Sequence, residues 1–140
     1  MGKKLKSVCQ SELNELHTFF QKWFNGELHK SNLIFQRLTT VLHPKFVLIS
    51  PDGKERKRKE VIQGIWDAYG SRDSKKDPMR IWIENYTYKG EFNFIYIVTY
   101  EEWHENNSNK KGRLSTAIFE KATNNYNDIS WLHVHETWLE

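Results

Sequence analysis

The spacing of apolar residues changes once along this 140-residue chain, and that change constrains the fold more than any other feature. Before Met79, apolar residues recur every three or four positions, which is typical of amphipathic helices. After Met79 they alternate with polar residues, and turn-like clusters divide this half into strands at roughly 80–88, 92–104, 113–122 and 129–139. This order predicts an α+β fold in which helices pack on one face of a strongly curved, mostly antiparallel sheet.

Three helices are expected in the first half of the chain. The first begins at Ser7, where an S-x-x-Q capping box starts, and ends at Gly26, since glycine adopts the left-handed conformation that closes helices. The second is capped by Ser31 or the asparagine after it and is ended by Pro44. A short strand at 46–49 and a third helix follow, before the chain enters the sheet.

The composition is that of one folded domain covering residues 1–140, with 38% hydrophobic and 28% charged residues. The chain lacks the apolar run of about 18 residues that a membrane helix needs, and its first residues lack the apolar stretch of a signal peptide, so a cytoplasmic protein with no membrane partner is expected. The single cysteine, Cys9, excludes an intramolecular disulfide and a multi-cysteine zinc site.

Side chains along the predicted strands separate into two faces, because successive residues of a strand point to opposite sides. One face is aliphatic, and the other is aromatic and polar. The aliphatic face contains Ile81, Ile83, Ile95, Ile97, Thr99, Leu114, Thr116, Ile118, Leu132 and Val134. The aromatic face includes Trp82, Tyr86, Tyr96, Phe119 and Trp131. A face this apolar exceeds what monomers usually expose, which favours a homodimer formed through the sheet.

The strand register follows from matching like faces. Placing Glu102 opposite Arg113 as a favourable charge pair brings Tyr100 beside Ser115. The last hairpin then places His135 beside Ser115. Small side chains on the middle strand, flanked by large ones on both neighbouring strands, leave a depression in this face, which we take as the candidate ligand site. Its predicted residues are Tyr100, Glu102, Ser115, His133 and His135.

Several segments carry a resemblance to a known superfamily. The segments FFQKWFNGE, VLHPKFVLISPDG and VTYEEW, and above all the terminal WLHVHETWL, resemble a bacterial branch of the nuclear transport factor 2-like superfamily. This cone-shaped, cystatin-like fold also includes ketosteroid isomerases and SnoaL-like cyclases. The resemblance implies a pocket between the helices and the curved sheet, with walls from Trp23 and Trp66. Because one scaffold supports many activities in such superfamilies, it does not assign the chemistry.

Two functions remain open at this point. In the first, the pocket binds a small apolar or aromatic molecule, with isomerase-like or cyclase-like acid–base chemistry in which Tyr100 is donor, Glu102 base and His135 shuttle. In the second, the chain is a non-catalytic homodimerisation domain. The choice depends on which sheet face the helices cover. If they cover the aliphatic face, His133 and His135 point outward and form the dimer contact.

Metal, cofactor and nucleic-acid sites are not expected. His133 and His135 present two imidazoles on one face, but Glu102 would lie two strands away, roughly 9–10 Å, so a third ligand is missing. The sequence also lacks a glycine-rich phosphate loop. The basic run from Lys54 to Lys59 has no interleaved aromatic residues and the net charge is only +3, so a solvated surface is favoured over a nucleic-acid interface.

Overall fold

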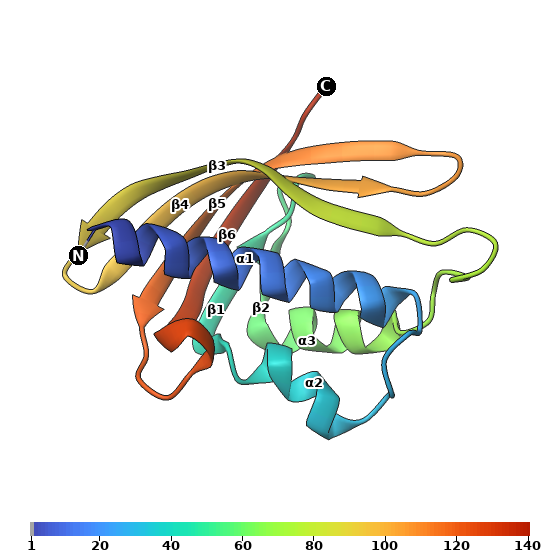
Figure 1. The fold of residues 1–140 in the computed structure, drawn as a ribbon, viewed down its shortest axis with the longest axis horizontal. Coiled ribbons are helices and arrows are strands. Elements are labelled where there is room, and N and C mark those ends of the chain that lie inside the picture. The colour runs from blue at the N-terminus through green and yellow to red at the C-terminus, as the bar shows by residue number, and fades with distance from the viewer. Residues whose placement is uncertain (1) are drawn as a thin grey trace.

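Six strands form one mixed sheet in the order β2-β1-β6-β5-β4-β3 in the computed structural model, which describes residues 2–140 (Figure 1). Strand β1 runs parallel to β6, and the other neighbouring strands are antiparallel. The strands are β1 (Leu42–Ile49), β2 (Glu55–Lys57), β3 (Arg80–Phe92), β4 (Ile95–Glu105), β5 (Lys110–Lys121) and β6 (Ile129–Trp138). The helices are α1 (Gly2–Phe24), α2 (Asn32–Thr39), α3 (Arg58–Asp67) and the short 3-10 helix η1 (Tyr126–Asp128).

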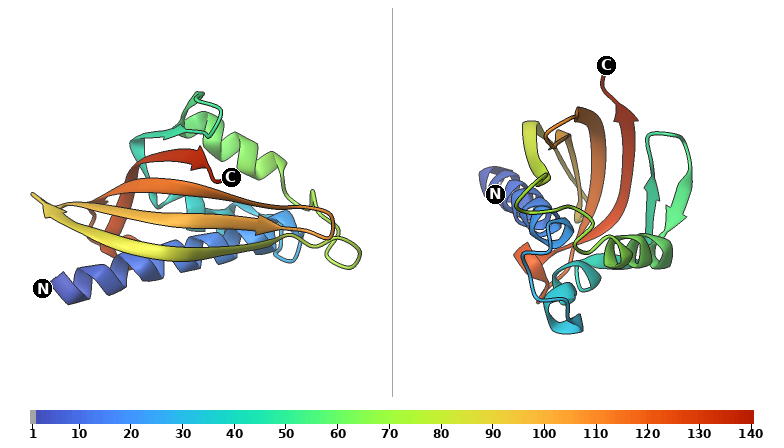
Figure 2. Two further views of the ribbon diagram at one scale, coloured as in Figure 1. Left: turned by 90° about the horizontal axis from the view of Figure 1, so that it is seen from above. Right: turned by 90° about the vertical axis from the view of Figure 1, so that its right-hand side faces the viewer.

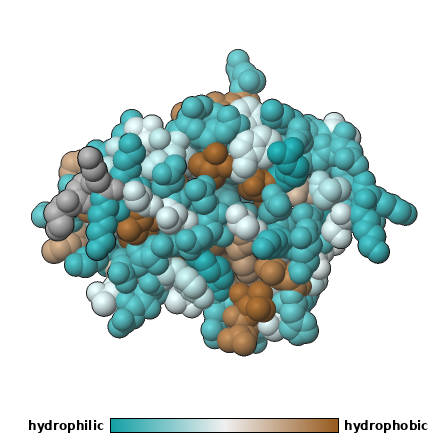
Figure 3. Space-filling view, viewed as in Figure 1, coloured by the Kyte–Doolittle hydropathy of each residue, from teal (hydrophilic) through white to brown (hydrophobic). Residues whose placement is uncertain are grey.

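All three α-helices lie on the same side of the curved sheet, which confirms the predicted α+β class (Figure 2). Helix α1 packs along the edge strand β3, while α3 packs against β1, near the opposite edge of the sheet. The apolar stripe of α1 is fully buried at Cys9, Leu13 and Trp23. The helix side of the molecule is mostly hydrophilic, with separate apolar patches (Figure 3).

Helix α1 begins at Gly2 rather than at the Ser7 capping box that the sequence predicts. The apolar stripe continues N-terminally, because Leu5 packs on the core one turn before Cys9, and burial of this turn extends the helix beyond Ser7. The predicted end is confirmed, since Gly26 has a φ of 68°.

Helix α2 is capped by the Ser31 hydroxyl, as predicted, but ends at Thr39 and not at Pro44. Pro44 instead lies within β1, in the irregular stretch between the pairs made by Leu42 and Val47. Proline is tolerated at such an irregularity of a strand, and it disfavours a helical conformation at the preceding residue. The predicted strand at 46–49 is therefore the second half of a longer one.

Part of the basic run has a structural role that the sequence did not reveal. Residues 55–57 form the exposed edge strand β2, where charged side chains discourage pairing with another chain. The guanidinium of Arg58 donates hydrogen bonds to the carbonyls of Thr39 (2.7 Å) and Leu42 (3.2 Å). It therefore holds the junction between α2 and β1.

The predicted register of the central hairpin is confirmed. Glu102 lies opposite Arg113, and Tyr100 lies opposite Ser115. The helices cover the aromatic and polar face, so Tyr96, Phe119 and Trp131 are buried in the core and are not available as a dimer contact. The prediction that this patch mediates dimerisation is therefore wrong.

A bulge in β6 overturns the predicted register of the last hairpin. Phe119 pairs with Trp131 but Ile118 pairs with His133, so Leu132 is an extra residue in β6. Beyond the bulge His135 lies opposite Thr116, and Ser115 faces Glu136 instead. Because one extra residue turns every later side chain over, the two histidines lie on the face away from the helices.

A second irregularity, in β3, changes the face of two isoleucines. Ile83 pairs with Glu102 and Ile81 is buried, so both lie on the helix side and not on the aliphatic face. The register shifts between Glu84 and Thr87, where Asn85 has a φ of 52°. This left-handed residue inserts the bulge that reverses the alternation along β3.

Candidate functional site

A cavity of about 190 Å³ lies between the helices and the sheet. Its apolar walls come from helices α1, α2 and α3 and from strands β1 and β6, and include Phe20, Phe24, Leu38, Leu48, Val61 and Val134. Its polar end is formed by α1, β4, β5 and β6. The polar lining residues are His17, Tyr100, Glu102, His104, Arg113 and Glu136. A partly apolar cavity with convergent polar groups is the usual form of a small-molecule site.

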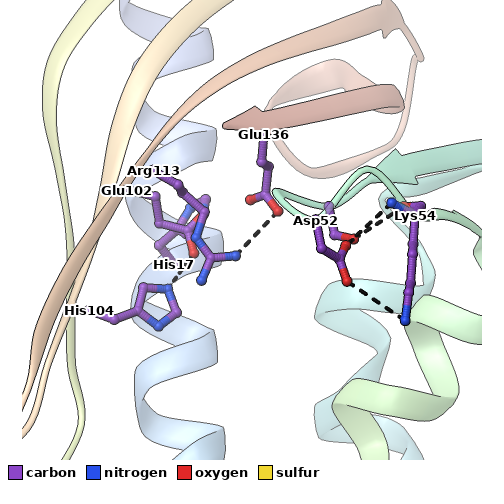
Figure 4. Close-up of polar contacts among 8 residues, drawn as sticks. His17, Asp52, Lys54, Glu102, His104, Arg113 and Glu136 are labelled. Atoms are coloured by element: carbon purple, nitrogen blue, oxygen red, sulfur yellow. Dashed lines mark hydrogen bonds and ion pairs between the residues drawn. The ribbon is translucent and has the colours of Figure 1, made fainter. Parts of the chain in front are cut away.

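Glu102 is the centre of the polar end, and two histidines bind its carboxylate (Figure 4). His17 Nε2 lies 2.9 Å from Glu102 Oε1, and His104 Nε2 lies 2.5 Å from Oε2. The other ring nitrogen of His17 donates to the Leu13 carbonyl at 2.7 Å. Since a carbonyl and a carboxylate both accept, both nitrogens of His17 carry protons and the ring is an imidazolium.

The pKa directions agree with this charge assignment. Burial alone would lower the pKa of His17, but the charge and hydrogen bond of Glu102 outweigh it, so the pKa is raised. Burial would raise the pKa of Glu102, but His17 and His104 hold it well below its usual range. Glu102 is therefore ionised at neutral pH and is a weak base.

Glu136 is the second buried carboxyl of this cluster, and the bulge in β6 is what turns it inward. Burial and the nearby Glu102 charge raise its pKa to about 7, although Arg113 partly offsets them. Arg113 donates to Glu136 Oε1 at 3.2 Å. A carboxyl that titrates near neutrality is the best-placed group of this cluster for accepting or donating a proton.

Tyr100 lies fully buried beside this cluster, with its ring centroid 5.8 Å from that of His17. Burial, then the Glu102 and Glu136 charges, raise the pKa of its hydroxyl well above the ordinary value. Tyr100 therefore keeps its proton and can donate a hydrogen bond. Ser115 is fully buried next to it but does not line the cavity.

Of the predicted site residues, the structure brings Tyr100 and Glu102 into the cavity and leaves the others outside its lining. His133 and His135 lie on the far face of β6, with ring centroids 6.5 Å apart. His135 is exposed there, so it has no access to Glu102 as a proton shuttle.

Trp23 and Trp66 also lie outside the cavity lining. Their ring centroids are 5.4 Å apart in an aromatic cluster with Phe35, where α1 meets α3. The Trp23 indole donates to the Ile65 carbonyl at 2.7 Å. This cluster packs the helices together behind one wall of the cavity.

Four polar cavity residues were missed from the sequence. Two of them had a signal: His17 lies one turn after Leu13 on the apolar stripe of α1, and His104 shares the face of Glu102 two residues further along β4. Arg113 was used only to fix the register. Glu136 was not considered, because alternation without a bulge puts it on the face opposite His135.

A separate buried ion pair joins α1 to α2 and β6. Glu12, which is fully buried, accepts from Arg37 at 2.7 and 3.2 Å and from the Trp131 indole at 2.9 Å. The nearby Cys9 thiol has a pKa raised to about 12 by burial and then by Glu12, so it is not a nucleophile. These groups secure the core around the cavity.

Within residues 2–140, no group of three or more histidine, cysteine or acidic side chains is arranged to hold a metal ion. None of the described helices has both the length and the apolar composition needed to cross a membrane.

Comparison with known families identifies relatives for nearly the whole chain. The family described as "Sucrose-6-phosphate phosphohydrolase C-terminal" matches residues 9–140. "Probable sucrose-phosphatase 3a" of Arabidopsis thaliana is 26% identical over 129 residues, which is 92% of this chain. "Sucrose-phosphatase 2" of Nicotiana tabacum is 24% identical over 129 residues. The chain spans 30% of the length of each of these relatives.

Solved structures confirm the fold that the resemblance implied. An NTF-2-like protein of unknown function from Pseudomonas aeruginosa superposes with a TM-score of 0.83 at 17% identity, covering 95% of this chain and 99% of that one. The CaMKII hub of S. rosetta superposes with a TM-score of 0.67 at 14% identity, covering 99% and 96%. At these identities the likeness establishes the nuclear transport factor 2-like fold and no more.

Proposed function

Since the chain belongs to the sucrose-6-phosphate phosphohydrolase C-terminal family, we propose that it is a small-molecule-binding domain whose cavity takes a sugar-sized molecule bearing hydroxyl groups. The observation that carries the proposal is the cavity of about 190 Å³ with apolar walls and one polar end. Its volume is below the roughly 300–1,000 Å³ of sites for drug-sized ligands, which favours a molecule of monosaccharide size.

The chemistry of the cavity suits a hydroxylated ring. Sugar rings have an apolar C–H face, which can pack against Phe20 and Val61, while hydroxyl groups can pair with charged acceptors and donors such as Glu136 and Arg113. The names of the curated relatives, which are sucrose-phosphatases, support a sugar as the ligand class.

The proposal concerns binding and not turnover. Glu102, the base expected from the sequence, is held ionised by two histidines, and His135 points away from the cavity. Isomerase-like or cyclase-like chemistry would therefore depend on Glu136, whose pKa of about 7 suits proton transfer. Turnover of a bound sugar that is lost in Glu136→Gln would extend the proposal to an enzyme.

Titration of the protein with glucose and with fructose, monitored by NMR of the protein, tests the binding proposal. Val61 is half-buried in the cavity wall, so Val61→Trp fills the cavity and should weaken binding at least tenfold. Val8→Trp is the matched control, because Val8 is equally half-buried but lies away from the cavity on α1. Equal binding by both variants would contradict the proposal.

We also infer that two copies of the chain assemble through the outer face of the sheet, defined as the side away from the helices. That face carries half-buried Ile97 and Ile118 together with exposed Leu114, and no described helix covers it. Apolar faces of this kind usually mark interfaces. The likeness to CaMKII hub structures supports an assembly role alongside ligand binding.

A further inference from the structure

A second cavity, of about 140 Å³, adjoins the proposed sugar cavity, and His104 and Arg113 line both. The second cavity also contains Arg72, Lys111 and Trp138. We call these five residues the vestibule. They come from β4, β5, β6 and the loop after α3, which the chain brings together at the polar end of the sugar cavity.

The vestibule concentrates positive charge. Lys111 Nζ lies 5.2 Å and Arg113 Cζ 4.9 Å from the centroid of the Trp138 ring, so both cations gather around one indole. The backbone of Arg72 is held in place by a hydrogen bond of 3.0 Å from its N–H to the Phe24 carbonyl. Three cationic side chains, Arg72, Lys111 and Arg113, therefore line one cavity.

These cations are poorly compensated by the protein. In the part of the chain that the structure describes, Arg72 and Lys111 form no ion pair, and the buried Nε of Arg113 has no hydrogen-bond partner. The carboxylates that line the adjoining cavity are Glu136, bound to Arg113, and Glu102, bound to two histidines. The vestibule thus offers unused donors and positive charge to an anion.

We propose that the vestibule binds the phosphate group of a phosphorylated sugar whose ring occupies the adjoining cavity. Arginine and lysine suit a phosphate because the guanidinium donates in a planar fork and the ammonium is a compact charge. Because His104 and Arg113 line both cavities, the proposed sites for the ring and for the phosphate lie next to one another. The inference rests on the proposed function for the sugar ring.

Glucose, glucose 6-phosphate and inorganic phosphate are the three test ligands. We expect glucose 6-phosphate to bind at least tenfold more tightly than glucose, with an advantage that decreases as salt increases. The double variant Arg72→Ala/Lys111→Ala should lose that advantage while binding glucose as before. Lys110→Ala is the matched control, since this neighbouring lysine lies on the outer face beside Trp82 and Trp103 and not in the vestibule.

The outcomes separate the two proposals. Equal affinity for the two sugars, or a phosphate advantage that survives in the double variant, would overturn the vestibule assignment and leave the sugar cavity intact. If neither sugar binds but inorganic phosphate binds the parent and not the double variant, the anion site is supported while the sugar proposal fails. Val61→Trp should weaken both sugars and leave inorganic phosphate unchanged.

Discussion

Glu136 is the side chain whose charge the fold alters most consequentially near neutral pH. Its pKa rises from an ordinary value of 4.5 to about 7 because it is buried beside the Glu102 carboxylate. Between these values the folded chain retains a proton that the unfolded chain has released. Raising the pH through this window therefore favours unfolding.

We expect the protein to be less stable at pH 8 than at pH 5. The Glu136 shift corresponds to roughly 2–3 kcal/mol of unfolding free energy, or about 5–10 °C in melting temperature. His17 adds to the same trend, since its raised pKa gives stability that is present below 6.5 and lost as the pH passes its folded value. Glu102 does not change the stability between pH 5 and pH 8, because its pKa is lowered and its contribution to the unfolding free energy is already complete above pH 4.5.

Thermal melts at the two pH values check this expectation. Glu136→Gln removes the contribution of this carboxyl and should reduce the pH dependence to the part that His17 supplies, whereas Glu91→Gln, at an exposed position on β3, should keep the full dependence. An identical melting temperature for the parent at pH 5 and pH 8 would show that Glu136 is not a buried acid.

At the scale of elements, the bulge in β6 decides which side chains reach the cavity. The extra residue, Leu132, lets Trp131 and Val134 both face the helices, although three positions separate them. A regular strand would instead bury His135 and expose Val134. The bulge therefore brings Glu136 to the cavity and sends His135 to the opposite face.

Thiol labelling distinguishes the two registers. In the native protein, His135→Cys should react with a thiol reagent at least tenfold faster than Val134→Cys, because position 135 is exposed and position 134 is buried. The parent should react slowly, since Cys9 is buried and its pKa is raised to about 12. Faster reaction of the cysteine at position 134 than of the one at position 135 would contradict the bulge and support the regular register that the sequence predicts.

At the scale of the whole molecule, the proposed ligand site and the proposed interface between copies lie on different faces of the sheet. The inner face holds the cavity under the helices, and the outer face remains open for a second copy. The proposed ligand site and the proposed interface therefore use different residues, whereas the sequence analysis treated them as alternatives for one face of the sheet. The two proposals are therefore compatible with each other.

Light scattering should give a mass about twice the 16.8 kDa of one chain. Thr116→Lys places a charge at the middle of the outer face and should shift the mass toward one chain, because burying an unpaired ammonium is costly. Thr18→Lys, at an exposed position on α1, should leave the dimer intact. A parent that scatters as a single chain would reject the assembly proposal.

The sequence by itself determined the order of the three α-helices and of the long strands β3 to β6, the fold class and the pairing of β4 with β5. Sequence periodicity predicts these features because each depends on local spacing. The apolar stripe marks α1, alternation marks β4, and the charge pair of Glu102 with Arg113 sets the register of β4 with β5. Gly26 marked the end of α1 for the same local reason, since its left-handed φ suits a glycine.

Only the tertiary structure decided which sheet face is inner and which polar residues meet in the cavity. The inner face follows from helix packing, and the side chains that β6 adds to it depend on one extra residue, Leu132, which reverses alternation without a clear sequence signal. The meeting of His17 with Glu102 joins residues 85 positions apart, and it forms only when α1 packs across the sheet. Local spacing carries no information about such a contact, because helix packing brings the two residues together.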